Sequence, residues 1–376
     1  MTGQFRPSSA HVDLDAVAAN VSYLADLAAP AVVCAVVKAD GYGHGAAAVA
    51  RAALEAGAGM LGVALVEEVL ELRATGIGAP VLLLSQAPAG SEAAVVEAGA
   101  TATVYTASGI DALAAAASAA GQDAVVHLKV NTGMNRVGCQ PEDAVALARR
   151  VVTAPGLHLG GTWTHFAVAD EPDLDYTAAQ AKLFDAVVAD IEADGIDPGT
   201  LHAANSAATL ADPERYRYGM VRCGIAIYGI APAPGLAGCE RLRPAMSLRS
   251  ELTHVRRLEP GERISYGLRY TLDRESWIGT VPLGYHDGVR RALSGKADVL
   301  VGGVRRPVAG TITMDQFMVD LGTDEVPVGS EVVLIGRQGD EEIRAEEWAA
   351  LLGTIGYEIT CGISARVPRV HERNPT

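Results

Sequence analysis

Short apolar runs rich in valine and leucine alternate with longer alanine-rich segments over residues 31–229. The short runs predict strands, and the longer segments repeat apolar residues at helical spacing. Strands that are apolar on both faces are typical of a parallel sheet covered by helices, and eight of them predict a closed (β/α)8 barrel of the TIM type. The predicted strands are residues 31–38, 60–66, 80–85, 101–105, 124–130, 157–165, 200–205 and 221–229, and the predicted helices are 46–57, 66–74, 108–120, 141–152 and 176–194.

The pattern changes after residues 231–238 (APAPGLAG), a proline- and glycine-rich stretch that we interpret as a linker. Beyond it, strand-like runs alternate with tight turns such as Pro260-Gly261 and Gly302-Gly303. We therefore predict an α/β barrel followed by a mostly β, mainly antiparallel C-terminal domain. The expected domains are residues 1–235 and 236–376, with residues 1–10 as a candidate for packing on the C-terminal domain.

Composition narrows the class of protein. With 376 residues, of which 49% are hydrophobic and 20% charged, the chain is expected to be soluble and globular rather than disordered. A formal charge of −15 disfavours nucleic acid as a partner. No run approaches the roughly 18 apolar residues of a membrane helix, and the N-terminus lacks the apolar core of a signal peptide. We therefore expect a cytoplasmic protein without a membrane partner.

Cysteine usage and charge distribution add two expectations. The five cysteines are widely spaced and include no Cys-x-x-Cys, which argues for a reducing compartment and against a disulfide framework or a zinc site. Residues 1–235 hold 12 Lys and Arg against 25 Asp and Glu, whereas residues 236–376 hold 18 against 20. We interpret this imbalance as a feature of assembly, in which the second part of one subunit meets the first part of another.

Candidate catalytic groups follow the predicted strands, since barrel enzymes carry their chemistry at the carboxyl ends of strands. Lys38 ends the first run among apolar neighbours, which should lower the pKa of its amine and make it nucleophilic. The simpler alternative is a lysine that reaches out to solvent. The glycine-rich loop that follows Lys38 (ADGYGHG) favours a functional role, because it lets a bulky ligand approach the backbone.

A phosphate site is predicted at the last two barrel strands. Ser206 follows the seventh strand, and Arg222 to Ile225 end the eighth, where barrels bind phosphate through backbone N–H groups. The loop after Lys38 lacks the spacing of a dinucleotide-binding motif, and the chain contains no Gly-x-x-x-x-Gly-Lys-Ser/Thr. A nucleotide is therefore a weak candidate for the bound phosphate compound.

A series of motifs, in one order from about residue 6 to about residue 370, resembles the signatures of alanine racemases. The resemblance implies an enzyme that uses pyridoxal 5′-phosphate to interconvert L- and D-alanine, and so supplies D-alanine for peptidoglycan. It also implies a homodimer in which the β domain of one subunit completes the active site of the other. The motifs are AVVKADGYGHGA around Lys38, NTGMNRVG around Arg136, THFAVAD around His165, HAANSAAT, MVRCGIAIYG around Arg222, ISYG around Tyr266, VPLGYHDG, MDQ and GYEI around Tyr357.

The resemblance assigns Lys38 and Tyr266 as the two bases, one on each face of the substrate Cα. Lys38 would bind the cofactor covalently and handle the D-alanine proton, and Tyr266 would handle the L-alanine proton. A free tyrosine with a pKa near 10 is a poor base, so its phenolate needs a neighbour. By resemblance that neighbour is His165, which is linked to Arg222.

Arg222 would face the pyridine nitrogen of the cofactor. Because guanidinium gives up its proton only above about pH 12, the ring stays largely unprotonated, which restricts side reactions such as transamination. The remaining roles implied by the resemblance fall into three groups. Phosphate contacts are Tyr42, Ser206, Gly224, Ile225 and Tyr357; substrate-carboxylate contacts are Arg136 and the Met314 backbone; supporting residues are Lys129, His202, Asn205, Tyr285 and Asp315.

Three points stay open at the level of sequence. Lys129 is either carboxylated on its amine to hold Arg136 or part of an ordinary salt bridge. The chain has His286 where the family commonly has alanine, and Thr311 where it commonly has arginine, which leaves the preference for alanine open. The alternatives are a racemase of another small amino acid such as serine, a related pyridoxal-phosphate decarboxylase, and a non-catalytic protein that binds pyridoxal phosphate.

Overall fold

The computed structural model describes residues 5–373, which form two compact units. We call residues 17–41 and 45–243 the barrel unit, and residues 5–16, 42–44 and 244–373 the β unit. The expected domain boundary between residues 235 and 236 stays a prediction. The proposed packing of residues 1–10 falls in part on residues 1–4, which lie outside the described residues.

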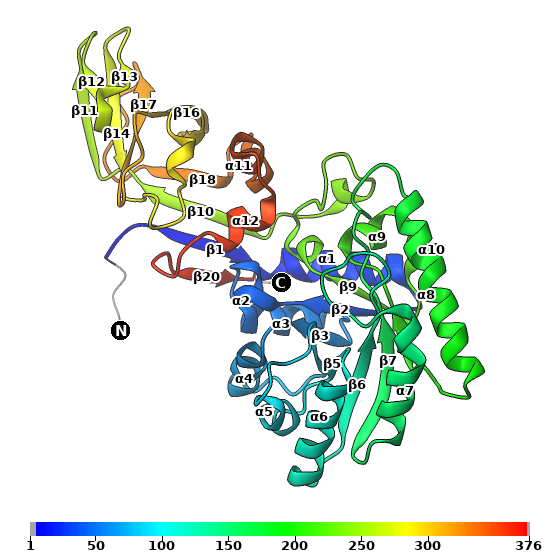
Figure 1. Cartoon of the computed structure of the whole chain (residues 1–376). Helices are drawn as coiled ribbons and strands as arrows, with labels where there is room; N and C mark the ends of the chain where they lie inside the picture. The colour runs from blue at the N-terminus through cyan, green and yellow to red at the C-terminus, as the bar shows by residue number, and fades with distance from the viewer. Residues whose placement is uncertain (1–4, 374–376) are drawn as a thin grey trace. The chain divides into compact units, whose positions relative to one another are not determined.

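The eight strands predicted for the barrel are present and parallel (Figure 1). They form the orders β4-β3-β2-β9 and β5-β6-β7-β8. A bridge between Leu82 and Thr101 connects the two sets on one side. Backbone bonds from Gly219 N to Leu201 O and from Arg222 N to Ala204 O, each 3.0 Å, connect them on the other, so the barrel is closed. The strands are β2 Val32–Val36, β3 Met60–Val63, β4 Val81–Leu83, β5 Ala102–Val104, β6 Ala124–Lys129, β7 Leu157–Trp163, β8 Thr200–His202 and β9 Met220–Cys223.

Helices lie around the outside of these strands (Figure 1), and the five that the sequence predicts are all present. Their inward faces carry small and branched residues, such as Val49 and Ala50 of α3, that pack closely on the sheet. Four further helices, α1, α5, α9 and α10, and the short α2 were not predicted. The helices are α1 Leu14–Ala28, α2 Lys38–Tyr42, α3 Ala46–Glu55, α4 Val66–Ala74, α5 Glu92–Glu97, α6 Ala107–Ala120, α7 Ala144–Thr153, α8 Asp175–Ala193, α9 Ser206–Ala211 and α10 Pro213–Tyr216.

The β unit is built on one ten-stranded, mainly antiparallel sheet, which confirms the predicted C-terminal architecture. Its order is β11-β14-β17-β16-β15-β18-β10-β1-β20, with β19 paired to β18. Two helices, α11 Ala345–Leu352 and α12 Gly356–Cys361, complete it. The strands are β1 Ser9–Asp13, β10 Met246–Glu251, β11 His254–Leu258, β14 Ser276–Val281, β15 Asp298–Val301, β16 Val304–Ala309, β17 Phe317–Gly322, β18 Glu331–Gln338, β19 Glu341–Ile343 and β20 Arg369–Glu372, beside a separate ribbon of β12 Arg263–Ile264 and β13 Tyr270–Thr271.

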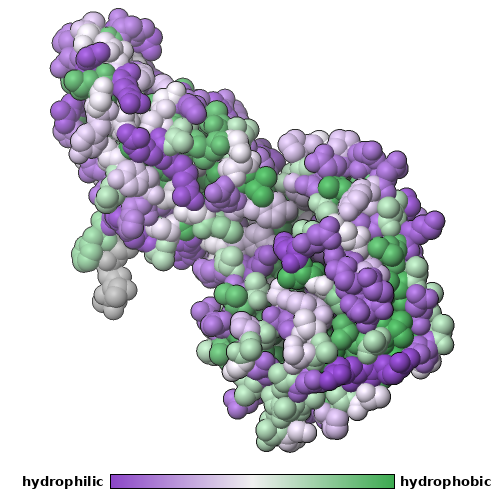
Figure 2. Space-filling model, in the orientation of Figure 1, coloured by the Kyte–Doolittle hydropathy of each residue, from purple (hydrophilic) through white to green (hydrophobic). Residues whose placement is uncertain are grey.

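The face of each unit that is drawn in Figure 2 is mixed in polarity. Hydrophilic side chains cover much of this face on both units, and hydrophobic side chains form smaller groups among the hydrophilic ones. Among residues 5–373, no helix combines the length and the apolar character that a membrane span requires.

Candidate active site

Five strands of the barrel deliver the predicted polar side chains at their carboxyl ends. Lys38 begins α2 directly after β2, and Lys129 is the last residue of β6. His165 follows β7 by two residues, and His202 and Arg222 lie in β8 and β9. Because the barrel is closed and its strands are parallel, these ends gather at one mouth. The charges of Lys38, Lys129 and Arg222 all act on the His165 ring, which places these groups in one electrostatic environment.

Arg222 is the centre of a buried hydrogen-bond network. Only 3% of its side chain is exposed. Its Nη1 donates to His202 Nδ1 at 2.8 Å, and its Nη2 lies 2.9 Å from His165 Nδ1, 2.9 Å from Thr164 O and 2.8 Å from Ala203 O. Two N–H groups, the one on Nε and the second one on Nη1, donate to no acceptor within residues 5–373. Arg222 therefore keeps donors for a ligand with a hydrogen-bond acceptor, and Nε is one of them.

Among the described residues, no carboxylate forms a hydrogen bond or ion pair with this arginine. Burial lowers the pKa of Arg222 to about 10, so the guanidinium is still charged at neutral pH. Burial also raises the pKa of Cys34 and of Cys223 to about 12, so both neighbouring thiols are neutral. The guanidinium lies over the Trp163 ring, 4.5 Å from its centroid, which compensates part of the lost hydration. The barrel mouth is thus positively charged in a protein with a formal charge of −15.

The histidines of the network are held neutral. Burial, and then the charge of Arg222, keeps the pKa of His165 and of His202 well below the ordinary value. The same two causes lower the pKa of His127 to about 4, and its Nδ1 lies 2.9 Å from His202 Nε2. Sequence reasoning did not single out His127, since a histidine inside an apolar strand is most simply a residue of the core.

The Lys129 amine is buried within reach of the charges of Arg222, Arg136 and Lys38. Its Nζ donates to Leu84 O at 3.3 Å and lies 3.9 Å from the centroid of the Trp163 ring. Burial and the charges of Arg222, Arg136 and Lys38 lower its pKa to about 6, so the amine is neutral at pH 7. Within residues 5–373 no carboxylate pairs with Lys129, so the salt bridge considered from the sequence is not formed there.

Backbone donors gather at the end of the barrel where a phosphate is predicted. Ser206 Oγ accepts from Gly224 N at 3.0 Å and from Ala226 N at 3.4 Å, which leaves its hydroxyl hydrogen to donate elsewhere. Asn205 Oδ1 caps α9 by accepting from Ala208 N at 3.0 Å. The amide of Ile225 has no acceptor among the described residues, as is usual for the first residue of a helical turn. These groups suit an anion with several acceptor oxygens.

Two acidic side chains, which the sequence analysis missed, shape the loop after Lys38. In that loop Ala39, Asp40 and Gly41 take left-handed backbone angles, with φ of 53°, 51° and 61°. Asp40 Oδ1 accepts from Ala46 N at 2.9 Å, and Glu68 Oε1 accepts from Ala39 N at 2.6 Å. Glu68 stands third in α4, a position where Glu commonly caps a helix, and this signal was available in the sequence.

The β unit brings together the two tyrosines predicted to contact phosphate. The rings of Tyr42 and Tyr357 lie 5.9 Å apart between centroids. The segment Tyr42–His44 is held in this unit by Arg369 Nε, which donates to Gly43 O at 2.9 Å, and by His371 Nε2, which lies 2.7 Å from His44 O. Lys38 and Tyr42 therefore belong to one short loop but to different compact units.

A second group of predicted residues lies on three joined loops of the β unit, 265–268, 284–287 and 311–316, which we call the rim. Tyr266 is 73% exposed there, and Met314 is 51% exposed. Thr311 Oγ1 donates to Tyr266 O at 2.7 Å. Tyr285 N and His286 N donate to Thr313 O and Met314 O at 3.0 and 3.1 Å. Hydrogen bonds between the loops of the rim thus hold Tyr266, Tyr285 and Met314 in exposed positions.

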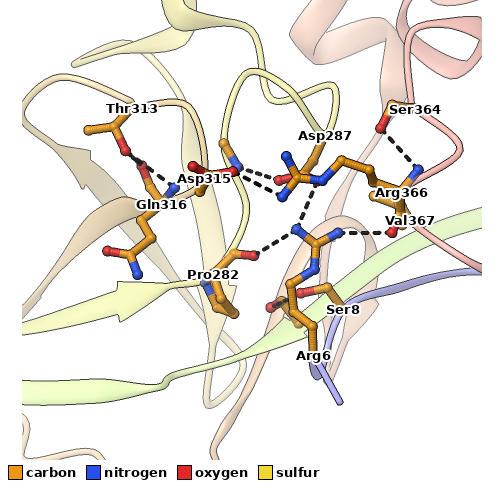
Figure 3. A network of polar contacts seen from close by, with 12 residues as sticks. Arg6, Ser8, Pro282, Asp287, Thr313, Asp315, Gln316, Ser364, Arg366 and Val367 are labelled. Atoms are coloured by element: carbon orange, nitrogen blue, oxygen red, sulfur yellow. Dashed lines mark hydrogen bonds and ion pairs between the residues drawn. The ribbon is translucent and has the colours of Figure 1, made fainter. Parts of the chain in front are cut away.

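A buried carboxylate, Asp287, connects the rim with the N-terminal segment and with Arg366 (Figure 3). Asp287 is fully buried, and its Oδ1 accepts from Arg6 Nη1 at 2.8 Å while its Oδ2 accepts from Gly284 N at 3.0 Å. Arg366 lies between two acids, with Nε 3.4 Å from Asp287 Oδ1 and Nη2 2.9 Å from Asp315 Oδ1. Asp315, predicted from the sequence as a supporting residue, is thereby linked to the N-terminal segment through Asp287.

Both units match family models. The model for the N-terminal domain of alanine racemases covers residues 12–232, and the model for their C-terminal domain covers residues 245–371. An alanine racemase of Symbiobacterium thermophilum is 48% identical, with 97% of each chain covered, and one of Thermobifida fusca is 45% identical over 97% of this chain and 98% of its own. The fold and the site thus define a class of two-domain proteins, in which a (β/α)8 barrel with a cationic mouth is followed by a C-terminal β domain. The chain belongs to the alanine racemase family.

Solved structures agree with this assignment. The alanine racemase of a D-cycloserine-producing Streptomyces lavendulae is 42% identical and superposes with a TM-score of 0.94, with 99% of both chains covered. A histidine racemase of Leuconostoc mesenteroides is 29% identical and superposes with a TM-score of 0.91, over 98% of this chain and 99% of its own. The same fold is therefore found in racemases named for different amino acids.

Proposed function

We propose that this protein is a pyridoxal 5′-phosphate-dependent alanine racemase that works as a homodimer. The observation that carries the proposal is the buried, carboxylate-free network of Arg222 at the barrel mouth, which leaves Nε as a donor for an aromatic ring nitrogen. When bound, pyridoxal phosphate supplies an electron sink that makes the Cα proton of an amino acid acidic enough to remove. Membership of the alanine racemase family supports alanine as the substrate.

The chain's own groups fit each part of this cofactor. The hydroxyl of Ser206 and the amides of Gly224 and Ile225 would hold the phosphate, together with Tyr42 and Tyr357. Lys38 would supply the amine that binds the aldehyde. Arg222 would donate a hydrogen bond to the ring nitrogen and keep its proton, since its pKa stays near 10. Because Arg222 would give no proton to the ring, it would favour return of the proton to Cα over transamination.

Two bases on opposite faces of Cα account for inversion. In this proposal the Lys38 amine moves the proton on one face, and the phenol oxygen of Tyr266 of the partner subunit moves it on the other. Tyr266 is 73% exposed on its own β unit, so its hydroxyl is available to a second chain. His165 Nδ1 accepts from Arg222, so its Nε2 carries a hydrogen that can stabilise the phenolate.

Arg136 would bind the carboxylate of the amino acid, assisted by the backbone of Met314 of the partner subunit. The Arg136 side chain is exposed, and it has no hydrogen bond or ion pair within residues 5–373. We further propose that the Lys129 amine adds carbon dioxide to form a carbamate that holds Arg136. The reaction forms an N–C bond, releases one proton and requires the neutral amine, which burial favours at pH 7.

Chiral analysis tests the proposed activity. L-amino acids, including alanine, serine and histidine, are incubated with the purified protein, with pyridoxal phosphate added or omitted. The proposal predicts that L-alanine is racemised most rapidly. Faster conversion of serine or histidine would favour a racemase of another amino acid, and conversion of none would overturn the proposal. Lys38→Ala is the control, since it should lose both activity and the visible absorbance of the bound cofactor.

Mixing two inactive variants tests the shared site. Lys38→Ala and Tyr266→Phe each lack one base, but a mixed dimer of the two contains one site with both bases. Exchange of subunits should therefore restore activity to at most about one quarter of the wild-type level, since about half of the dimers are mixed in an equal mixture and each mixed dimer has one intact site out of two. An absence of recovery after demonstrated subunit exchange would contradict sites formed between subunits.

A further inference from the structure

We propose that His127 is a positioning residue that fixes the tautomer of His202 and thereby the orientation of Arg222 at the barrel mouth. This inference rests on the proposed function only for its effect on catalysis. Its structural part, a line of hydrogen bonds that runs His127–His202–Arg222–His165, concerns side chains of the barrel unit alone.

The bond directions in this line are consistent with one arrangement of hydrogens, in which Arg222 and His127 favour the same tautomer of His202 from its two sides. Guanidinium has five N–H donors and no acceptor, so the atoms that face it must accept. His202 Nδ1, 2.8 Å from Arg222 Nη1, is therefore unprotonated, and His202 as a neutral ring carries its hydrogen on Nε2. That hydrogen points to His127 Nδ1, 2.9 Å away, so His127 accepts there and carries its own hydrogen on Nε2.

The neutrality of both rings is consistent with their surroundings. His202 is fully buried and His127 is 4% exposed. The titratable and charged groups around them are Arg222 and Lys129, and no carboxylate pairs with either ring in the described part of the chain. A second positive charge on an imidazole would be both desolvated and repelled by Arg222.

Packing holds the two rings in this relation. Trp163 stacks on His202, with an interplanar angle of 14° and 5.2 Å between centroids. Gly161, which precedes Trp163 by two residues on β7, lies against His127: a Cβ at Gly161 would come within 2.9 Å of His127 Nδ1 and 2.8 Å of Cε1. The glycine thus leaves space for the imidazole in the core, and the rings are restrained from both sides.

Loss of the acceptor at residue 127 would act through His202. With no acceptor at residue 127, the Nε2 hydrogen of His202 would be buried and unpaired, which is unfavourable. This would weaken the present tautomer relative to one with the hydrogen on Nδ1, where it would face the Nη1 donor of Arg222. Two donors 2.8 Å apart repel, so the guanidinium would shift, and its Nε would no longer be held in place for a ligand. The function of His127 is therefore to help keep His202 Nδ1 unprotonated, so that this atom can accept a hydrogen bond from Arg222.

The first experiment reads the tautomers in the wild-type protein. With ¹⁵N-labelled histidine, NMR should show His127 and His202 neutral at pH 7, each protonated on Nε2, with a nitrogen–nitrogen coupling across their shared hydrogen. Protonation of His202 on Nδ1, or a doubly protonated His127, would overturn the proposal. This readout requires neither the cofactor nor racemase activity, so it stands even if the proposed function fails.

The second experiment separates an acceptor from mere packing. In His127→Asn the side-chain oxygen replaces Nδ1, whereas His127→Leu fills similar space without an acceptor. We expect His127→Asn to keep kcat within about threefold of wild type and His127→Leu to lower it about tenfold or more. The His202 signals should keep the Nε2-protonated form in His127→Asn and lose it in His127→Leu. His158→Leu, at an exposed position of β7, is the matched control.

Three results would overturn the inference: equal kcat in the Asn and Leu variants, an unchanged His202 tautomer in His127→Leu, or a larger loss in His127→Asn. If His127→Leu does not fold, the wild-type NMR result and the His127→Asn variant decide the question. If the wild-type chain racemises no amino acid but shows the expected tautomers, the proposed function fails and the hydrogen-bond line stands.

Discussion

At the scale of single residues, the site is defined by what surrounds its cations. Motifs place Lys38, Arg136 and Arg222 at predicted strand ends, and the predicted link between Arg222 and His165 is present. The bonds from Arg222 to His202, Thr164 and Ala203 were not predicted, since they depend on the register of β6, β7 and β8. His127 illustrates the difference: its strand AVVHLKV has an ordinary core pattern, and only the three-dimensional pairing reveals a ring against His202.

The depressed pKa of His127 predicts how stability depends on pH. Its pKa is about 4 in the folded chain and near 6.5 in the unfolded chain, so between these values only the unfolded state binds the proton. Folding stability should therefore fall as pH is lowered from 6.5 to 4, with up to about 3 kcal/mol arising from this residue. Denaturant unfolding at several pH values measures the slope. His127→Asn should flatten it, and an unchanged slope would contradict a buried neutral ring.

The low pKa of the Lys129 amine predicts that it reacts with carbon dioxide. Its neutral amine should take up carbon dioxide, so protein prepared in ¹³C-bicarbonate should show a carbamate carbon signal by NMR. The signal should vanish in Lys129→Gln and persist in the control Lys182→Gln, which changes a lysine of α8 on the outside of the barrel. A spectrum without the signal near neutral pH would refute the carbamate.

At the scale of elements, the barrel was more predictable than the β unit. Buried parallel strands are apolar on both faces and so leave a strong local signal, and all eight were found. The order of the β sheet leaves no such signal. Strand β1, near the N-terminus, lies between β10 and β20, and this pairing of distant segments depends on long-range contacts. The placement of Tyr42–His44 in the β unit was unpredictable for the same reason.

Close packing between two loops of the rim predicts a steric effect. A Cβ at Gly284 would lie 2.3 Å from the carbonyl oxygens of both Thr313 and Met314. Gly284→Ala should therefore displace the 311–316 loop and lower the free energy of unfolding by about 1–3 kcal/mol. The matched control is Gly78→Ala, where a Cβ meets no atom within 4 Å. Chemical denaturation of both variants compares the two, and equal stabilities would show that the rim tolerates the added atom.

At the scale of the whole molecule, charge is distributed unevenly. The cationic mouth lies within residues 1–235, which hold 12 basic against 25 acidic residues. The charge of the mouth is therefore opposite in sign to the net charge of the part of the chain that forms it. Tyr266 and Met314 are both exposed on the β unit, which agrees with the proposed homodimer, in which a partner subunit would cover them. The sequence predicted both residues through motifs, but their exposure became known only from the fold.

The charge division predicts a salt-sensitive dimer. If the arginine-rich residues 236–376 of one subunit meet the acidic residues 1–235 of another, screening should weaken their attraction. Sedimentation velocity at about 0.05 M and about 0.5 M sodium chloride should then show weaker association at the higher salt. Dimer affinity that is independent of salt would argue for an interface dominated by apolar contacts.

If two bases act on opposite faces of Cα, removal of one base should make the two enantiomers of alanine differ in how fast they exchange the Cα hydrogen in D₂O. In Tyr266→Phe the Lys38 base is intact, so D-alanine should exchange its Cα hydrogen for deuterium while keeping its configuration. L-alanine should exchange no faster than it does with Lys38→Ala. Proton NMR with chiral analysis follows both reactions. Equal exchange of the two enantiomers by Tyr266→Phe, or racemisation at the wild-type rate, would contradict the two-base account.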